Sequence, residues 1–422
     1  MKNRSKVVLS LLMCMMIFSM LTGVSLSREK AFLIGVPEPM GFDPGHQIVS
    51  GMNLAVEEIN AKGGVLGRPI VLKVVDTRDR EAGVPVADCL ASIEKLILKE
   101  KVDVLCGGPD RSEVALATFE LVAKHKIPHL FASVGPMSPK LAKVIASDPE
   151  KYRYTFKVVS HAGDLVKTVL GGVMQMRKEF GFDSFFQLGQ DVIWARGAAG
   201  IAAKILKKAG FKDKGAEYFP LGCTDFAPGL MKAKMSGAPI LLYWMDMPQT
   251  VAMLKLWHDM KIKGVLIGAS GGALASHKTW DMTGGKIKYL MDAECPIGQC
   301  PAKVNEWHDR FRANYKKKYG HWGATMGPAY GYMGPYIMAD AVKRAGSFDK
   351  AAIAAAIQET DMIGVFGRVT FDKKTHHSPY GNDPEKEAVM GVIQWMSETP
   401  HLVYPPKLAA SPIKLPEWML KK

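Results

Sequence analysis

The sequence is poor in the features of membrane-embedded or disulfide-rich proteins. Its 422 residues contain six cysteines and one long apolar run, and the mean hydropathy is near zero. A polytopic membrane protein would need several runs of about 20 apolar residues. The composition, with 48% apolar and 23% charged residues, is typical of globular proteins. At about 100 to 200 residues per domain, the length predicts two or three packed domains.

Several enzyme motifs are also missing. The sequence has no G-x-x-x-x-G-K-[ST], no H-E-x-x-H and no G-x-G-x-x-G after its first predicted strand. The histidine pair 376–377 lies in a polar stretch, where solvation is more common than metal binding. We therefore expect no cofactor and no metal site.

The amino terminus has the pattern of a secretory signal peptide. Lys2, Arg4 and Lys6 precede an apolar stretch over 7–21, and small residues follow at 25–27. This stretch is short for a bilayer span. We expect residues 1–27 to be removed on export, which would leave a soluble periplasmic chain. An uncleaved anchor is the alternative.

Cysteine use fits an exported chain. Cys14 would leave with the signal peptide, and five cysteines would remain. Cys295 and Cys300 are the best-spaced pair for a local disulfide in an oxidising compartment.

The charge balance is basic without the signature of a nucleic-acid-binding protein. The formal charge is +14, and the three basic residues in 1–27 leave +11 for the exported chain. Lysine and arginine are spread along the whole chain, with dense runs only at 316–318 and 373–374. We expect a solvated basic surface that attracts anionic solutes and no nucleic-acid partner.

From residue 31 onward, short apolar runs alternate with amphipathic stretches of helical periodicity. The first strands are predicted at 31–36, 70–75, 102–106 and 128–131, with helices at 47–61, 85–101 and 113–126 between them. The same alternation restarts at 154 and continues to 268. Parallel neighbours require crossover connections, so the pattern predicts an α/β fold with two parallel sheets covered by helices.

Ligands of such sheets bind beyond the carboxyl ends of the strands. The loops there mix glycine with hydroxyl, charged and aromatic residues, so we predict ligand contacts from them. The candidates are Phe42, Asp110, Arg111, Ser112, Ser133, Gly135, Trp194, Tyr243, Trp244, Asp246 and Ser270. Ser112 could instead only cap a helix, Arg111 could be a surface residue, and the two tryptophans could serve in packing alone.

An enzyme is the competing interpretation of one of these loops. The segment 268–272 matches the G-x-S-x-G nucleophile motif after a strand, with Ser270 as the candidate nucleophile. Asp292 and one of His321, His376, His377 or His401 would have to complete a triad. Short motifs in glycine-rich loops arise readily by chance, and we expect no enzymatic activity.

Four blocks of the sequence occur in a familiar order. The first runs over 50–70 and contains Gly63-Gly64 and Gly67, and the others run over 127–133, 327–341 and 364–372. Together they resemble periplasmic type I solute-binding proteins of the branched-chain amino acid and amide ABC transporter family. The resemblance covers nearly the whole exported chain.

The resemblance implies two Rossmann-like lobes joined by a hinge of three crossings. It places 28–156 and 288–358 in the N-terminal lobe, and 157–287 and 359–422 in the C-terminal lobe. A monomer would bind a small solute in the cleft and hand it to an ABC transporter permease. A ligand-sensing subunit of the same fold is the alternative.

The resemblance also implies roles for the candidate residues. A ligand carboxylate would lie near 110–112 and 133–137, with the aromatic side chains of Phe42 and Trp194 around the ligand. The family's glutamate for a ligand ammonium is replaced here by Ala269-Ser270. A buried ammonium without a carboxylate partner is costly. We therefore expect an apolar or aromatic carboxylate, paired with Arg111, or, second, a branched-chain-type amino acid with Asp246 as the replacement acid.

Overall fold

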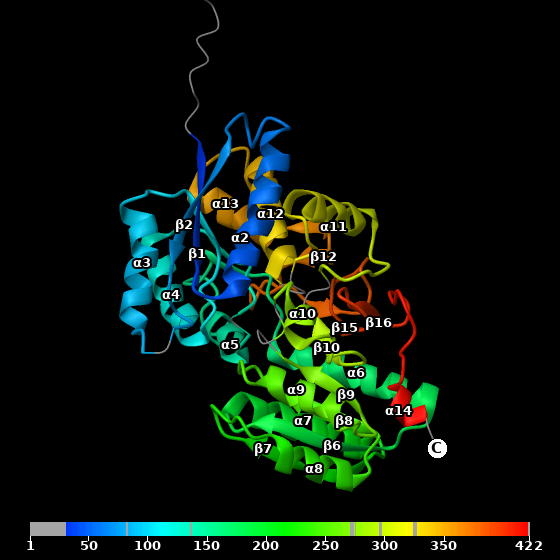
Figure 1. The fold of residues 1–422 in the computed structure, drawn as a ribbon. Coiled ribbons are helices and arrows are strands. Elements are labelled where there is room, and N and C mark those ends of the chain that lie inside the picture. Colours follow the sequence, from blue (N-terminus) through cyan, green and yellow to red (C-terminus); the bar gives the residue numbers. More distant parts are fainter. Residues whose placement is uncertain are drawn as a thin grey trace, which may run out of the picture.

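The computed structural model describes residues 31–81, 83–135, 137–270, 274, 276–294, 298–323 and 327–420. They form two lobes that lie one above the other in Figure 1. The predicted signal peptide, 1–27, lies outside the described residues. Within the described part of the chain, no helix has both the length and the apolar character needed to cross a membrane.

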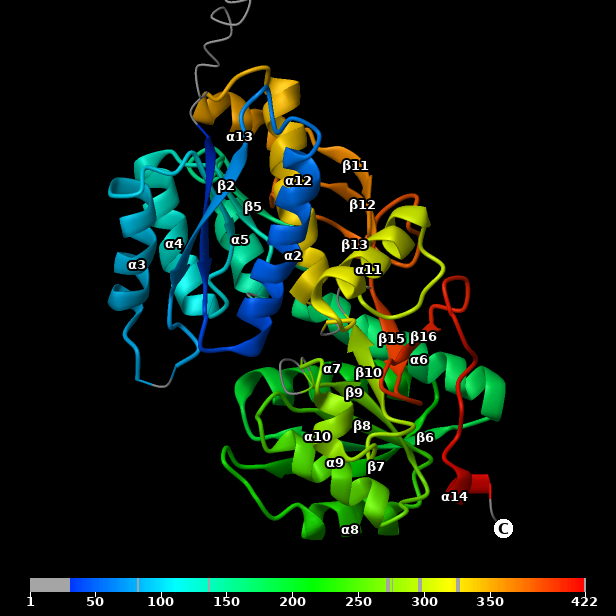
Figure 2. The ribbon, with the colours of Figure 1, turned by 45° about the horizontal axis from the view of Figure 1, so that its top comes forward.

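The first lobe is built on five parallel strands in the order β2-β1-β3-β4-β5. The strands are β1 (Phe32–Glu38), β2 (Ile70–Asp76), β3 (Val104–Gly107), β4 (His129–Phe131) and β5 (Thr155–Lys157). Its helices are α2 (Asp43–Asn60), α3 (Val86–Leu98), α4 (Ser112–His125), α5 (Pro139–Ser147), α11 (Glu306–Tyr319), α12 (Gly327–Ala345) and α13 (Lys350–Gln358). In Figures 1 and 2, α3 and α4 cover one side of this sheet and α2 and α12 the other. Coverage on both faces explains why β1, β3 and β4 are almost entirely buried.

The second lobe contains a seven-stranded sheet in the order β16-β15-β10-β9-β8-β6-β7. Its parallel strands are β6 (Ser184–Gln190), β7 (Lys212–Phe219), β8 (Ile240–Trp244), β9 (Val265–Ala269) and β10 (Met291–Glu294), and β15 (Gly391–Gln394) and β16 (His401–Tyr404) add antiparallel. The helices are α6 (Ala162–Phe180), α7 (Ile193–Lys208), α8 (Ala227–Ser236), α9 (Thr250–Asp259), α10 (Thr279–Thr283) and α14 (Glu417–Leu420). Alternate residues of β8 point to opposite faces, so Tyr243 packs in one core and Trp244 in the other.

A small third sheet lies beside the first lobe. It consists of β11 (Asp361–Gly364), β12 (Gly367–Thr370), β13 (Tyr380–Gly381) and β14 (Ala388–Val389). Val365, Phe366 and Phe371 pack into the core of the first lobe, whereas the sequence-based division assigned 359–422 to the second. Conversely, β10 pairs with β9 in the second lobe, although 288–358 was assigned to the first. The division of the chain into lobes is therefore set by which strands pair with one another. The resemblance alone did not predict these pairings.

The chain passes between the lobes three times. Val158 belongs to the first core and Val166 to the second lobe. The second passage lies between β10 and α11, and the third lies at Ala388 and Val389, which belong to cores on opposite sides of the hinge. The predicted α/β fold with two parallel-sheet lobes and three crossings is confirmed.

Candidate functional site

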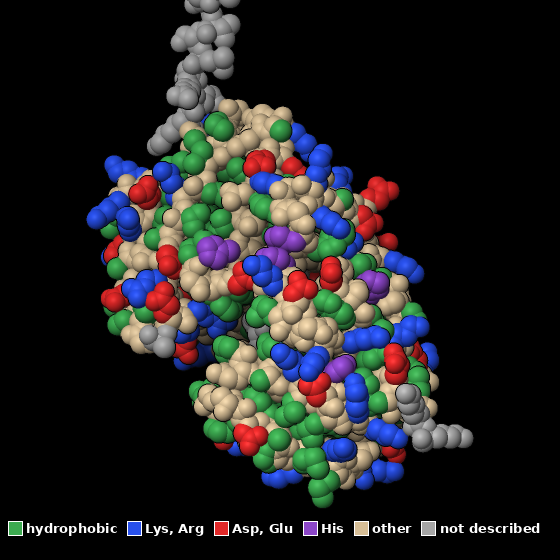
Figure 3. All heavy atoms as spheres, viewed as in Figure 1, with side chains coloured by type: hydrophobic (Ala, Val, Ile, Leu, Met, Phe, Trp, Pro, Cys, Tyr) green, Lys and Arg blue, Asp and Glu red, His purple; other side chains and the backbone are tan. Residues whose placement is uncertain are grey.

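The carboxyl ends of the first lobe's strands point toward the waist between the lobes. In Figure 2, β1 runs from the top of the molecule down to the waist, where α2 begins. The other four strands are parallel to β1, so their following loops gather at the same edge. The second lobe reaches this waist as well, because the ring of His277, after β9, stacks on that of His321, after α11, with centroids 3.9 Å apart. Figure 3 shows that the surface is hollowed at this waist.

A buried network joins the ends of three strands in the first lobe. Ser133 Oγ lies 3.0 Å from Glu38 Oε2 and 2.5 Å from Asp110 Oδ1. The backbone N–H of Gly108 donates to Glu38 Oε1 at 2.8 Å, and that of Gly135 to Asp110 Oδ1 at 3.2 Å. Burial raises the pKa of Glu38 well above its usual range, and the nearby Asp110 carboxylate adds to this effect. Burial also raises the pKa of Asp110, and the guanidinium of Arg80 opposes that shift.

Arg80 is the basic residue that reaches this network. Its Nε lies 3.5 Å from Asp110 Oδ2, and its guanidinium lies 4.9 Å from the centre of the Phe42 ring. The Arg80 side chain is 38% exposed, whereas that of Asp110 is fully buried. The loop after β2, residues 77–80, was not among the predicted site segments. A charged run directly after a strand is the signal that would have found it.

The predicted arginine, Arg111, points elsewhere. Both of its terminal nitrogens donate to the carbonyl of Val84 at 3.3 Å, and its backbone N–H donates to Asp79 Oδ2 at 2.6 Å. Arg111 also takes the N-cap position of α4, so Ser112 is the first helical residue. Within the described part of the chain, no hydrogen bond or ion pair joins Arg111 or Ser112 to Ser133 or Gly135.

In the second lobe, two of the predicted residues lie inside the sheet. Tyr243 and Trp244 are fully buried, and the Trp244 indole N–H donates to Gln187 Oε1 at 3.0 Å. Trp194, in the first turn of α7, is only partly buried, and Asp246 is exposed. The side-chain amide of Gln190 donates to Asp246 Oδ1 at 2.6 Å. Trp194 and Asp246 are thus the predicted residues of these two loops that reach the edge of the lobe.

Ser270 is hydrogen-bonded to the carboxyl group of Asp292. Its backbone N–H donates to Asp292 Oδ1 at 3.0 Å, and its hydroxyl donates to Asp292 Oδ2. Ser270 is buried, and burial raises the pKa of Asp292 to about 6. Within the described part of the chain, no hydrogen bond joins Ser270 to a histidine. The serine–histidine pair that a hydrolase needs is therefore not assembled here.

The histidine pair near the third crossing differs from its predicted environment. His376 and His377 are both buried, although solvation was expected. Nδ1 of His377 lies 2.6 Å from Nε2 of His161, and the two rings stack. Burial lowers the pKa of His161 to about 4, with a further contribution from the Lys157 ammonium. The contact between these histidines therefore connects the first inter-lobe crossing to the segment that leads to the third crossing.

The structure describes only one of the two cysteines of the predicted local disulfide. Cys300 is a buried free thiol, whereas Cys295 lies outside the described residues. Among the residues described, no three histidine, cysteine or acidic side chains are grouped as a metal site would require.

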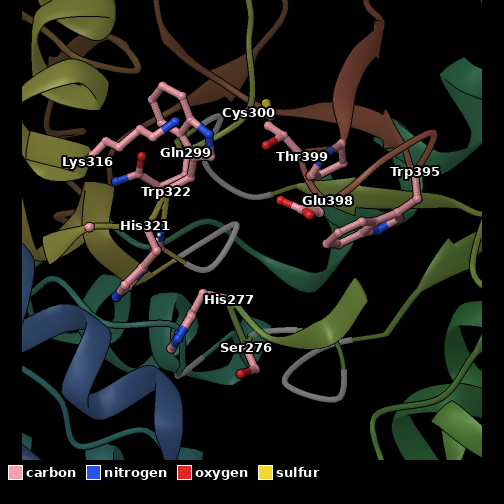
Figure 4. Close-up of a pocket in the computed structure, with 13 residues that line it drawn as sticks. Ser276, His277, Gln299, Cys300, Lys316, His321, Trp322, Trp395, Glu398 and Thr399 are labelled. Carbon is pink, nitrogen blue, oxygen red and sulfur yellow. Dashed lines mark hydrogen bonds between the residues drawn. The ribbon is translucent and has the colours of Figure 1, made fainter. Parts of the chain in front are cut away.

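A partly open cavity lies between the lobes. Its volume is about 180 Å³. It is lined by residues that follow β9, β10, α11 and β15, among them His277, Gln299, His321, Trp322 and Trp395. Of the described residues that line it, none belongs to the eleven predicted site residues. Figure 4 shows Lys316, Gln299 and Trp322 on one side, Trp395 and Glu398 on the other, and the two histidines below.

Comparison with known proteins gives the family. The model of the periplasmic binding protein family matches residues 33–382, and the chain belongs to this family. A Leu/Ile/Val-binding protein homolog 7 from Brucella melitensis is 24% identical over 377 residues, which cover 88% of this chain and 90% of that protein. The predicted family is confirmed.

Two solved structures share the fold. The branched-chain amino acid transporter substrate-binding protein LivJ from Streptococcus pneumoniae, in complex with isoleucine, has a TM-score of 0.69 and 18% identity, covering 92% of this chain and 100% of that one. A solute-binding protein of an ABC transporter from Rhodopseudomonas palustris HaA2, in complex with p-hydroxybenzoic acid, has a TM-score of 0.68 and 19% identity, covering 93% and 99%. At these identities, the likeness extends to the two-lobed fold.

Proposed function

We propose that this chain is an extracytoplasmic solute-binding protein that delivers a small molecule to an ABC importer. The ligand would be an apolar or aromatic carboxylate or, second, a branched-chain-type amino acid. One observation carries the proposal: two parallel sheets turn the loops after their strands toward a shared waist, and His277 and His321 bring the lobes into contact there. Ligands of such sheets bind beyond the carboxyl ends of their strands.

Cleft closure would follow from ligand contacts made by both lobes at once. Phe42, Arg80 and Asp110 lie in one lobe, and Trp194 and Ser270 in the other. A ligand that touches both sets favours the closed arrangement, and a shift from 1:99 to 99:1 requires about 5.5 kcal/mol of differential affinity. Small-angle scattering should therefore show a smaller radius of gyration when the ligand is added.

Arg80 and Phe42 support the carboxylate as the preferred ligand. The Arg80 guanidinium lies over the Phe42 ring, and the Arg80 side chain is 38% exposed, so nitrogen donors are left for a ligand carboxylate. The hydroxyl of Ser133 and the backbone N–H of Gly135 already donate hydrogen bonds to Asp110. The arginine that we expect to bind the carboxylate is therefore Arg80 and not Arg111. The relatives in complex with p-hydroxybenzoic acid and with isoleucine represent the two ligand classes to be compared.

Isothermal titration of the exported chain tests this proposal. We expect heat of binding with aromatic or apolar acids, and Arg80→Gln should weaken their binding about tenfold or more, as expected for a lost charge-assisted hydrogen bond. The matched control is Arg111→Gln, because the Arg111 guanidinium faces the Val84 carbonyl. Equal losses in both variants would contradict the role of Arg80. Tight leucine binding with no response to acids would refute the preferred ligand class, and no response to either class would refute the proposed function.

A further inference from the structure

One hydroxyl group lies between two buried carboxyl groups in the first lobe. Ser133 Oγ is 3.0 Å from Glu38 Oε2 and 2.5 Å from Asp110 Oδ1, and all three residues are buried. A hydroxyl group has a single hydrogen, so it donates to one carboxyl group only. At the other contact the carboxyl group must itself carry a proton and donate it to Ser133 Oγ. The two acids therefore hold at least one proton in the folded protein.

This proton lies on Glu38. The contact of Ser133 with Asp110 is the shorter of the two, as is usual when the acceptor is ionised. Asp110 also has a cation beside it, since Arg80 Nε lies 3.5 Å from its Oδ2. Burial raises the pKa of Glu38 well above its usual range, and the Asp110 carboxylate raises it further. Without ligand, Glu38 is therefore neutral, and Asp110 and Arg80 carry opposite charges.

The other titratable groups around the two acids favour protonation or are uncharged. After the effect of burial itself, the charge of Asp79 raises the pKa of both acids. Burial raises the pKa of the Cys106 thiol and lowers the pKa of His129 to about 3, so neither group is charged at neutral pH. Among the described residues, Arg80 is therefore the charge that keeps Asp110 ionised.

A ligand carboxylate at Arg80 changes this balance. It places a second negative charge on the guanidinium that stabilises the Asp110 carboxylate, and like charges in a site of low dielectric disfavour ionisation. Asp110 Oδ2 has no hydrogen-bond partner among the described residues, so it is free to accept a proton. Resting on the proposed function, in which Arg80 binds the ligand carboxylate, we propose that this chain takes up one proton from solvent, on Asp110, when the ligand binds. The ligand remains ionised, and the bound site then holds one ion pair, between Arg80 and the ligand.

Isothermal titration in buffers of different ionisation enthalpy counts this proton. The probe is p-hydroxybenzoate or, if it gives no heat, leucine, because both carry a carboxylate. It is titrated into the exported chain at pH 7 in phosphate, HEPES and Tris, and the slope of the observed enthalpy against the ionisation enthalpy of the buffer gives the number of protons taken up. We expect a net uptake that approaches one proton. The dissociation constant should then rise by up to about tenfold per pH unit between pH 6 and pH 8, as linkage to one proton requires.

Substitutions of single acids locate the proton. Asp110→Asn replaces the carboxyl group by one of similar shape that does not titrate, so the proton uptake and the pH dependence of the dissociation constant should both disappear. The matched control is Asp183→Asn, because the Asp183 carboxylate is partly exposed and pairs with Lys212. It should keep the uptake. Glu38→Gln should keep the uptake as well, because Asp110 remains and the new amide still donates to Ser133.

The possible results separate this inference from the proposed function. Binding without proton uptake overturns the inference and leaves the proposed function intact, and so does an uptake that Asp110→Asn retains. If p-hydroxybenzoate and leucine both fail to bind, the proposed function fails, and the coupled uptake fails with it. Infrared difference spectra of the unmodified protein cover the case in which Asp110→Asn does not fold. Ligand binding should add the C=O band of a protonated carboxyl group, and the absence of that band overturns the inference.

Discussion

Replacing Glu294 by glutamine should remove a large part of the pH dependence of the protein's stability. Glu294 ends β10 at the second crossing and is fully buried. One carboxylate oxygen accepts the backbone N–H of Gly298 at 3.0 Å, and the Cys300 thiol is a second, weaker donor to the same carboxyl group. Burial raises the pKa of Glu294 from 4.5 to about 8, whereas the hydrogen bond from Gly298 acts in the opposite direction.

The sign follows from proton binding in the two states. Between pH 4.5 and 8 the folded protein keeps the proton on Glu294, and the unfolded chain has lost it. The folded state then binds more protons, so the free energy of unfolding falls as the pH rises through this window. With 1.36 kcal/mol for each pKa unit, the contribution of Glu294 falls by about 2 kcal/mol between pH 6 and pH 8.

Urea unfolding at pH 6 and pH 8 measures this contribution. The loss of stability between the two pH values should be about 2 kcal/mol smaller in Glu294→Gln than in the unmodified protein. Glu398→Gln removes an exposed acid that lines the inter-lobe cavity and serves as the control for lost charge. If Glu294→Gln and the unmodified protein lose the same stability, Glu294 is ionised in the folded state at pH 6 and the reasoning fails.

Two further substitutions test the packing. In Gly51→Ala, the new Cβ would lie 2.2 Å from the carbonyl oxygen of Pro328, so α2 and α12 must move apart at a cost of about 1–3 kcal/mol. Gly163→Ala, where no atom lies within 4 Å of the new Cβ, is the control, and equal melting temperatures for the two variants would contradict the close approach. Trp244→Phe leaves Gln187 Oε1 buried without its indole donor and should lower the free energy of unfolding by about 1–3 kcal/mol in urea titration. An unchanged transition midpoint would show that another group satisfies Gln187.

The alternation of strands and helices was predictable because apolar runs and helical periodicity are local properties of the sequence. The gathering of Asp110, Ser133 and Gly135 was predictable as well, since parallel strands bring their following loops to one edge. The direction of each side chain was not. Arg80 and Arg111 both follow strand ends, yet only Arg80 stacks on Phe42, because Arg111 is turned toward the Val84 carbonyl.

Other features depend on pairing between distant segments. Asp292 meets Ser270 because β10 lies beside β9 in a register that aligns Asp292 with Gly268. The pairing of β15 with β10 brings Trp395 next to Leu290, where their backbones hydrogen-bond, and so places one wall of the inter-lobe cavity. Sequence patterns mark apolar runs but do not state which strands become neighbours. For this reason the sequence could not predict the cavity at Gln299.

The pairing of β15 with β10 also determines when the lobes can fold during synthesis of the chain. Residues 391–404 supply the two strands that cover the β10 edge, and α12 with residues 365–371 completes the core of the other lobe. A nascent chain that ends before these residues exposes a bare strand edge and an open core. Neither lobe can therefore complete its fold on the ribosome until the C-terminal quarter of the chain has emerged.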